Sequence, residues 1–209
     1  IAVAFALQAF RDHPATTDAR LALSARLAAV TAQRILGLAP GDTVTMEVLE
    51  ASVDGRALGD AEFGRLFNNL VVGGLETTRN TLALGLHQLI LHPEQYRMLE
   101  ADASLVPGAV EEFLRHQNTV VYLRRTATQD MDFLGEKIRE GDKLVCVLGS
   151  PNRDPAFFPE PERFDITRDN ARNHVAFGFG AHFCIGASLA RQQMHSAFTA
   201  LLERIDAPA

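Results

Sequence analysis

The sequence predicts a mainly α-helical fold with a small β-sheet, and three observations support this prediction. Apolar residues recur at helical spacing through most of the first two-thirds of the 209-residue chain. Residues 120–148 differ, because short β-branched or alternating segments are interrupted there by Gly135 and Gly141. Residues 185–205 return to a helical pattern. We therefore expect helices first, then short strands, and one closing helix.

The expected helices are bounded by glycine and proline. Segment 17–35 is rich in Ala, Leu and Arg and is followed by Gly37 and Pro40, and segment 43–52 predicts a short helix. A long helix follows over residues 60–92, and its run 70–75 is apolar nearly all round, which predicts burial. Pro93 and Pro107 mark the first turns of two further helices, where proline is tolerated.

The strands of the expected sheet are segments 120–125, 131–133 and 143–148. A loop rich in proline and aspartate follows over residues 150–174. A loop of this length inside a compact domain is usually functional or packed on itself. Segment 175–184 is rich in glycine, so the backbone that leads into the closing helix is free to turn tightly.

Composition argues against some classes of partner. The chain has 20 basic and 26 acidic residues, whereas a nucleic-acid binder needs a basic surface to neutralise phosphates. No apolar stretch approaches the ~20 residues of a membrane-spanning helix, so we expect no membrane contact. Two cysteines, Cys146 and Cys184, are too few for a disulfide framework, and we expect a cytoplasmic protein. The sequence begins at Ile1 rather than Met, and we expect a fragment of a longer chain.

Cys184 follows a glycine-rich approach and stands just before the expected closing helix. Gly178, Gly180 and Gly186 allow the backbone to turn tightly. A helix N-terminus has free N–H groups and partial positive charge, which stabilise a thiolate, and such a thiolate suits an axial haem ligand. Three other interpretations stay open on these residues alone: a buried structural thiol, a nucleophilic cysteine, and a zinc site that begins at His182.

The same stretch resembles the haem-binding signature of the cytochromes P450, Phe-x-x-Gly-x-x-x-Cys-x-Gly. Its fixed positions are occupied here by Phe177, Gly180, Cys184 and Gly186. The form with Gly178 and His182 is similar to that of bacterial members. The resemblance implies haem b (iron protoporphyrin IX) as the cofactor and Cys184 as its iron ligand. It also implies that the surrounding loop residues, His182 included, bind the cofactor.

A segment of the long helix resembles the oxygen-activation motif of the family's distal helix. It reads Gly73-Gly74-Leu75-Glu76-Thr77-Thr78. The resemblance implies that the two glycines leave space for haem and dioxygen, and that Thr77 and Glu76 deliver protons. Two glycines also distort a helix and open its hydrogen-bond ladder. Taken alone, the segment favours a helix that tolerates two glycines, with Glu76 and Thr77 on a solvated face.

Two further segments agree with the family. Glu112 and Arg115 match its Glu-x-x-Arg motif, and the i, i+3 spacing puts both charges on one helix face. Residues 158–164, Phe-Pro-Glu-Pro-Glu-Arg-Phe, match the segment that contributes a second arginine, Arg163. The resemblance implies that these three side chains form a buried structural network that holds the loop.

Arg125 aligns with the family's arginine that pairs with a haem propionate, to which a planar guanidinium can bind bidentately. The adjacent Arg124 can exchange roles with it, since neighbours on a strand face opposite sides. The resemblance also implies that His182 contacts the other propionate or its neighbour.

The resemblance implies the C-terminal half of the P450 fold, from the distal I helix to the proximal L helix, with the N-terminal half absent. We expect helices before the distal helix over residues 1–59, the I helix over 60–92, and the J and K helices over 93–118. The small sheet is expected over 119–149, the meander loop over 150–174, and the Cys-ligand loop with the L helix over 175–209.

The resemblance implies a haem-thiolate monooxygenase. Such an enzyme uses O2, with electrons from a ferredoxin and a ferredoxin reductase, to hydroxylate an apolar small molecule of terpene, steroid or fatty acid type. The expected substrate contacts are aliphatic: Leu70, Val71, Val120 and Val121. The alternatives are a peroxide-using haem-thiolate enzyme and a non-catalytic fragment. Glu76 and Thr77 argue against the first, because a peroxide user needs no such proton relay.

Overall fold

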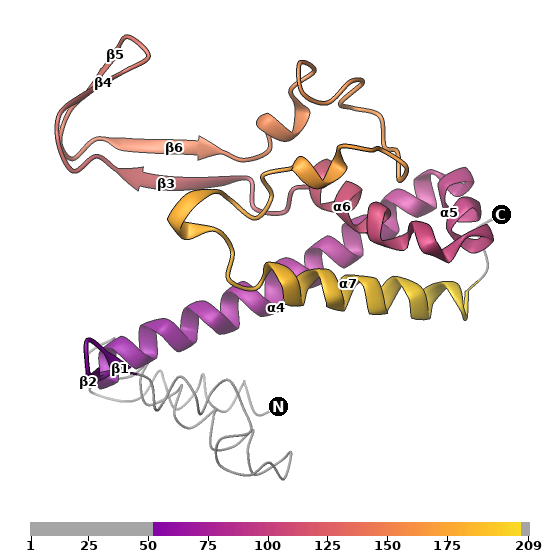
Figure 1. Ribbon diagram of the computed structural model, residues 1–209, viewed down its shortest axis with the longest axis horizontal. Helices are drawn as coiled ribbons and strands as arrows, with labels where there is room; N and C mark the ends of the chain where they lie inside the picture. The colour runs from indigo at the N-terminus through magenta and orange to yellow at the C-terminus, as the bar shows by residue number, and fades with distance from the viewer. Residues whose placement is uncertain (1–51, 206–209) are drawn as a thin grey trace, which may run out of the picture. The chain divides into compact units, whose positions relative to one another are not determined.

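The computed structural model describes residues 52–205 of the chain (Figure 1). The chain forms two compact units, residues 1–73 and residues 74–209. The helix expected at 17–35, and all of the one expected at 43–52 except its last residue, lie outside the described residues. The described elements are mainly helices with small two-stranded sheets, which confirms the predicted fold class.

A short β-hairpin opens the described part of the first unit. Strands β1 (Ser52–Val53) and β2 (Arg56–Ala57) pair in an antiparallel sense. The two residues between them, Asp54 and Gly55, have positive φ angles of 52° and 74°, as a type I′ turn requires. Ser52, the last residue of the short helix expected over residues 43–52, therefore lies in a strand, and the rest of the hairpin lies beyond that expected helix.

Helix α4 (Asp60–Leu91) matches the expected long helix to within one residue at its end. Glu62 in its first turn accepts a hydrogen bond from the Gly59 backbone N–H at 2.8 Å, which satisfies a donor at the helix start. Arg56 Nη2 donates to the other oxygen of the same carboxylate at 2.8 Å. One carboxylate thus caps the helix and ties it to the hairpin.

The apolar run at residues 70–75 of α4 does not show the burial that its composition predicts. Val71 and Val72 are 45% and 51% exposed, and Leu75 is 68% exposed. An apolar patch of this kind on a helix marks a surface that some other group covers.

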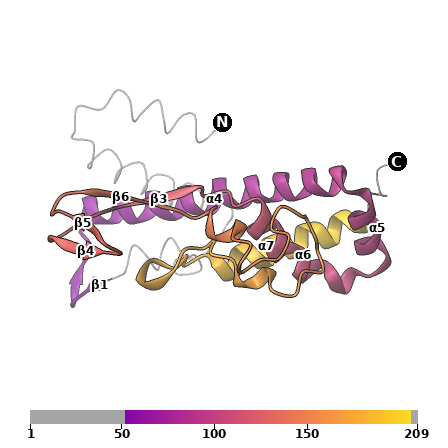
Figure 2. The ribbon, with the colours of Figure 1, turned by 90° about the horizontal axis from the view of Figure 1, so that it is seen from above.

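The second unit is built on the C-terminal part of α4 and three further helices, as the sequence predicts. These are α5 (Pro93–Ala101), α6 (Val106–His116) and α7 (Ala187–Leu202). Figures 1 and 2 both show α7 beside α6, which it contacts. The core that they share contains Leu89, Tyr96, Leu99, Val106, Val110, Phe113, Met194 and Phe198. Helix α6 lies at the centre of this core.

Helix α4 packs closely against α6 and α7 at Gly85. A Cβ atom at this position would lie 2.9 Å from Cγ of Phe113 and 3.1 Å from Cζ of Phe198. The two rings are themselves in contact, with centroids 4.6 Å apart. Only glycine therefore allows the three helices to pack at this separation.

The strands of the second unit form two separate antiparallel pairs instead of one small sheet. Strand β3 (Tyr122–Thr126) pairs with β6 (Lys143–Val147), and β4 (Met131–Phe133) pairs with β5 (Glu136–Ile138). The β4–β5 hairpin extends beyond the β3–β6 pair in Figure 1. The pattern of the sequence does not reveal β5, because a three-residue strand with one apolar side chain has no clear alternation.

The long loop over residues 150–174 packs on the core. It contains the short 3-10 turns η2 (Pro151–Arg153) and η3 (Ala171–Asn173). Its side chains Phe158, Phe164 and Ile166 are at most 4% exposed. This segment, which we call the meander loop, is thus held by its own apolar side chains.

Candidate active site

Cys184 closes a tight turn formed by residues 177–184. Gly178 and Gly180 have φ angles of 74° and 72°, a region that residues with a Cβ atom rarely adopt. The Phe183 N–H donates to the Gly180 carbonyl at 3.0 Å, and the Cys184 N–H donates to the Phe177 carbonyl at 2.9 Å. The backbone of Phe177 therefore sets the position of Cys184.

The Cys184 thiol is free and half-buried, directly before α7. The Cys184 carbonyl accepts the N–H of Ala187, the first residue of α7, at 3.2 Å. Cys146 is also free but is exposed on β6. Of the two thiols, Cys184 alone stands at the start of a helix, where N–H groups stabilise a thiolate.

Large apolar side chains flank this thiol in the turn and are open to solvent. Phe179 and Ile185 are 89% and 91% exposed, and Phe183 is 52% exposed. A concentration of exposed aromatic and aliphatic side chains marks a surface that another group covers. A flat, largely apolar macrocycle fits this turn, and a thiolate at a helix start fits the iron at its centre.

The predicted oxygen-activation motif lies in the middle of α4, where the first unit ends and the second begins. A Cβ atom at Gly73 or Gly74 would have open space around it. Glu76 is exposed and Thr77 is half-buried. The pair combines a solvated carboxylate with a hydroxyl that is partly withdrawn from water.

Thr81, one helical turn after Thr77, belongs to the same region. Its hydroxyl donates to the Thr77 carbonyl at 2.9 Å and lies 2.7 Å from the Thr119 hydroxyl. Thr81 is 4% exposed. These contacts join α4 to the segment between α6 and β3. No motif identifies Thr81 in the sequence, because a helical threonine can bond to the carbonyl four residues earlier whatever residue supplies it.

Glu112 and Arg115 form a buried ion pair on α6, with both side chains 0% exposed. Arg115 Nε donates to Glu112 Oε2 at 2.7 Å, and Arg115 Nη2 donates to Oε1 at 2.8 Å. The guanidinium also donates to the carbonyls of Asn152, Pro161 and Arg163, at 2.8, 2.9 and 3.2 Å. The pair therefore fastens the meander loop to α6.

The second arginine beside this pair is Arg168, and the prediction of Arg163 is wrong for its side chain. Arg163 points outward, where its guanidinium pairs with Glu160 at 3.1 Å and Asp165 at 3.5 Å. Arg168 Nε lies 3.4 Å from Glu112 Oε2, and its side chain is 8% exposed. Arg163 contributes its carbonyl, which accepts from Arg168 at 2.9 Å, because the loop turns the backbone rather than the side chain inward.

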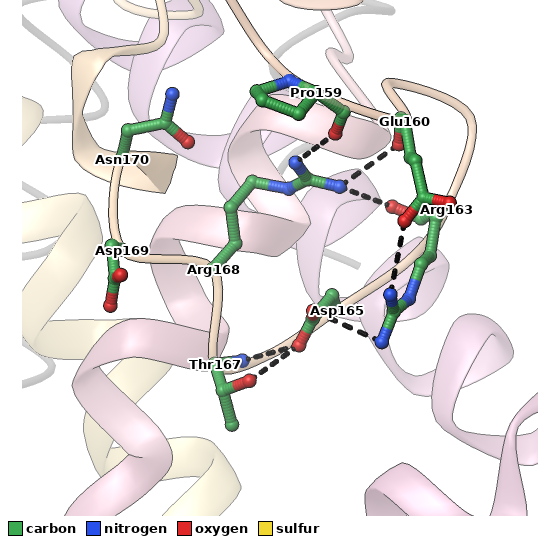
Figure 3. Close-up of a pocket in the computed structure, with 8 residues that line it drawn as sticks. All are labelled: Pro159, Glu160, Arg163, Asp165, Thr167, Arg168, Asp169 and Asn170. Carbon is green, nitrogen blue, oxygen red and sulfur yellow. Dashed lines mark hydrogen bonds and ion pairs between the residues drawn. The ribbon is translucent and has the colours of Figure 1, made fainter.

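A pocket of about 360 Å³ lies along this part of the meander loop (Figure 3). It is lined by Pro159, Glu160, Arg163, Asp165, Thr167, Arg168, Asp169 and Asn170. Arg168 donates to the carbonyls of Pro159 and Glu160 at 2.6 and 3.1 Å, as Figure 3 shows. The lining is polar and its arginines hold the loop together, so this pocket does not match the apolar substrate site expected from the sequence.

Arg125 and His182, the expected propionate ligands, are both exposed. Arg125 lies on β3, and its Nη1 donates to the Arg124 carbonyl at 3.0 Å. His182 ends the short turn η4 (Gly180–His182), two residues before Cys184. Their contacts with a cofactor stay predictions.

The expected substrate contacts lie on two elements. Leu70 and Val71 are on α4 in the first unit, where Leu70 is half-buried and Val71 is 45% exposed. Val120 and Val121 precede β3 in the second unit, where Val121 is 60% exposed. Their contacts with a substrate also stay predictions.

Glu111, His174 and Arg191 form a further polar cluster that no sequence motif reveals. Burial alone would raise the pKa of Glu111, but hydrogen bonds from His174 and Arg191 outweigh this effect and lower the pKa to about 2. Glu111 is therefore a carboxylate at neutral pH, inside the core of the second unit.

Comparison with known proteins identifies the family. The family model for cytochrome P450 matches residues 42–207. The chain belongs to the cytochrome P450 family. The family and the fold expected from the sequence are thereby confirmed, and membership implies a haem cofactor.

Relatives of this P450 chain include a bacterial monooxygenase and a bacterial hydroxylase. It is 40% identical over 166 residues to a steroid C26-monooxygenase of Mycobacterium tuberculosis, covering 79% of this chain and 44% of that protein. It is 44% identical over 162 residues to a methyl-branched lipid omega-hydroxylase of Mycobacterium bovis, covering 77% of this chain and 38% of that protein. The chain thus spans less than half the length of these relatives.

Solved P450 structures resemble the chain over most of its length. The bacillaene polyketide synthase P450 of Bacillus subtilis is 39% identical with a TM-score of 0.75, covering 86% of this chain and 46% of that one. A Bacillus megaterium P450 in complex with corticosterone is 31% identical with a TM-score of 0.76, covering 90% of this chain and 50% of that one.

Residues 52–205 contain neither a candidate membrane-spanning helix nor a candidate metal cluster. None of the helices in this range is long and apolar enough to cross a membrane. The same range contains no group of three or more His, Cys, Asp or Glu side chains arranged to hold a metal ion.

Proposed function

We propose that the full-length protein is a haem-thiolate monooxygenase that hydroxylates an apolar small molecule. The observation that carries the proposal is the position of Cys184: a half-buried, free thiol at the start of α7, fixed by its N–H bond to Phe177. It stands in a chain of the P450 family whose relatives include monooxygenases. A cytoplasmic location and a ferredoxin-type electron donor belong to the same proposal.

Cys184 and the turn around it hold the cofactor, haem b, in this proposal. The thiolate at the helix start would ligate the iron, and Phe179, Phe183 and Ile185 would supply apolar contacts to the cofactor. Arg125 and His182 supply positive charge or hydrogen bonds to the two propionates. Bound haem supplies the activation of dioxygen, and the protein supplies position and protons.

Thr77 and Glu76 deliver protons in this proposal. Glu76 is exposed and exchanges protons with water, whereas Thr77 is half-buried and presents a hydroxyl next to it on α4. Thr81 holds the Thr77 carbonyl at 2.9 Å and so limits the movement of this turn. The open space beside Gly73 and Gly74 leaves room for the reactants.

The substrate class is argued from side-chain type and from the relatives. Leu70, Val71, Val120 and Val121 are aliphatic and accessible to different degrees. The relatives described above are named for a steroid and for methyl-branched lipids. We therefore place a steroid or a branched lipid first among the substrates.

Replacement of each cysteine tests the iron ligand. The carbon monoxide complex of the reduced full-length protein should show the thiolate-type absorbance band of the P450 family. Cys184→Ala should abolish this band, and Cys146→Ala, the matched control in β6, should keep it. Loss of the band in the Cys146 variant alone, or its absence from the parent protein, would refute the proposal.

Replacement of adjacent threonines tests proton delivery. Thr77→Ala should leave haem binding intact but lower the product formed per electron consumed, with hydrogen peroxide as the by-product. Thr78→Ala, the neighbouring control, should keep the coupling of the parent protein. Equal coupling in the Thr77 variant and the parent would show that Thr77 does not deliver protons.

A further inference from the structure

Three side chains from distant parts of the second unit meet in one buried cluster, which we call the Glu111 cluster. Arg191 Nε on α7 donates to Glu111 Oε1 at 2.7 Å, and its Nη2 donates to Oε2 at 3.0 Å. His174 Nε2 lies 3.1 Å from the same Oε2. Glu111 and His174 are 9% and 8% exposed. Each oxygen of the Glu111 carboxylate therefore has a hydrogen-bond donor, as a buried charge requires.

The His174 ring connects this carboxylate to the backbone before the Cys184 turn. The Ala176 N–H donates to His174 Nδ1 at 3.1 Å, so Nδ1 is the acceptor nitrogen. The proton of the neutral ring therefore lies on Nε2, which donates to Glu111. A single imidazole thus carries a hydrogen-bonded chain from α6 to the residue next to Phe177.

The cluster also contacts Phe177 directly, through the Phe177 ring. The Arg191 guanidinium carbon lies 4.6 Å from the centroid of the Phe177 ring, and the His174 ring lies 5.6 Å from it. A guanidinium that is fixed by a carboxylate has a defined place over an aromatic face. Both the ring of Phe177 and the backbone beside it are therefore tied to Glu111.

We infer that the Glu111 cluster positions the Cys184 thiolate by holding Phe177, whose carbonyl accepts the Cys184 N–H at 2.9 Å. The inference rests on the proposed function, because it concerns the thiolate that ligates iron. None of the three side chains is a ligand itself. They are positioning residues that act through Phe177.

The inference gives two adjacent carboxylates of α6 different tasks. Glu112 pairs with Arg115 and holds the meander loop, as described above. Glu111, one residue earlier, faces α7 and the Cys184 turn through Arg191 and His174. Successive residues of a helix point about 100° apart, so one turn of α6 serves two loops.

Two replacements of His174 separate the two hydrogen bonds of its ring. In His174→Gln the side-chain amide reaches the place of Nε2, so the donor to Glu111 is kept and the acceptor for Ala176 is lost. In His174→Asn the side-chain carbonyl takes the place of Nδ1, so the acceptor is kept and the donor is lost. His195→Gln, an exposed histidine of α7, is the matched control.

The first readout is spectroscopic, on the full-length protein with haem. The quantity measured is the ratio of the thiolate-type absorbance band to the other bands of the carbon monoxide complex, at equal total haem. This ratio should fall about fivefold in His174→Gln, because one hydrogen bond is lost. His174→Asn, which loses the bond to Glu111 that orients the ring, should fall by a smaller factor of about two, and His195→Gln should match the parent. An equal ratio in all four proteins, or an equal fall in both His174 variants, would overturn the inference even if both variants are less stable.

The second readout needs no haem. In the haem-free full-length protein, amide hydrogen exchange over residues 176–184 should be about fivefold faster in His174→Gln than in His174→Asn. Equal exchange in the two variants would also overturn the inference. If the parent protein lacks the thiolate-type band, the proposed function fails, and the exchange comparison alone decides whether the cluster positions Cys184.

Discussion

Replacing Arg115 by methionine should be among the most damaging single changes in this chain. Methionine fills a similar apolar volume but supplies no N–H group. The buried Glu112 side chain would then have Arg168, 3.4 Å away, as its remaining cationic partner. The carbonyls of Asn152 and Pro161 would each lose the donor that Arg115 provides.

The magnitude follows from these losses. Removal of one partner of a buried ion pair costs about 3–5 kcal/mol, and each buried carbonyl left without a donor costs about 1–3 kcal/mol. The losses are not independent, and Arg168 offsets part of the first. We therefore expect the free energy of unfolding to fall by at least about 4 kcal/mol.

A double replacement shows whether the uncompensated charge is the cause. In Glu112→Gln with Arg115→Met, the buried carboxylate is removed, and Arg168 keeps the carbonyls of Pro159, Glu160 and Arg163 as acceptors. The double variant should therefore lose less stability than the sum of the single losses, by about 1–3 kcal/mol. Arg163→Ala is the matched control, because the Arg163 side chain is 60% exposed, and this variant should stay within about 1 kcal/mol of the parent.

Urea unfolding of the full-length protein at constant haem saturation, monitored by circular dichroism, measures these differences in the free energy of unfolding. The comparison requires that the dependence of this free energy on urea concentration is the same in all variants. A loss below about 1 kcal/mol in Arg115→Met would refute the reasoning. So would an equal loss in Arg163→Ala, since that result would place the exposed arginine in the network.

Three further outcomes are expected. Gly85→Ala should cost about 1–3 kcal/mol in urea unfolding, because the new Cβ overlaps the Phe113 ring. Tyr96→Phe should cost about 1 kcal/mol in the same assay, since its hydroxyl donates to the Ile205 carbonyl at 2.6 Å. The pKa of Glu111 is about 2 in the folded chain against an ordinary 4.5, so its stabilising effect is present above pH 4.5 and is lost as pH falls towards 2. Glu111→Gln should therefore flatten the pH dependence of the unfolding midpoint in that window, and an unchanged slope would contradict this.

The helices of the second unit were predictable because their signals are local. Pro93 and Pro107 lie in the first turns of α5 and α6, and the long apolar pattern defines α4. The hairpin before α4 was also within reach, since Asp54-Gly55 is a strong signal for a two-residue turn. The division of the strands into two pairs was not, because pairing depends on partners far apart in the sequence.

The site was predictable where a motif fixes the residue and its neighbours, and less so where a loop decides the direction of a side chain. Glu112 and Arg115 share a helix face by their spacing alone. Arg163 and Arg168 lie on the same loop, and only its path sends the first outward and the second to Glu112. The contacts of Glu111 were equally hard to predict, because its partners His174 and Arg191 lie 63 and 80 residues away in sequence.

These separations have a consequence for synthesis on the ribosome, where the chain emerges from its N-terminus. Arg115 follows Glu112 by three residues, so that pair can form as soon as α6 has been made. Arg191 is translated 80 residues after Glu111, and until then this carboxylate lacks its bidentate partner. The meander loop can therefore be fastened before α7 is made, whereas the Cys184 turn is secured only after α7 has been made.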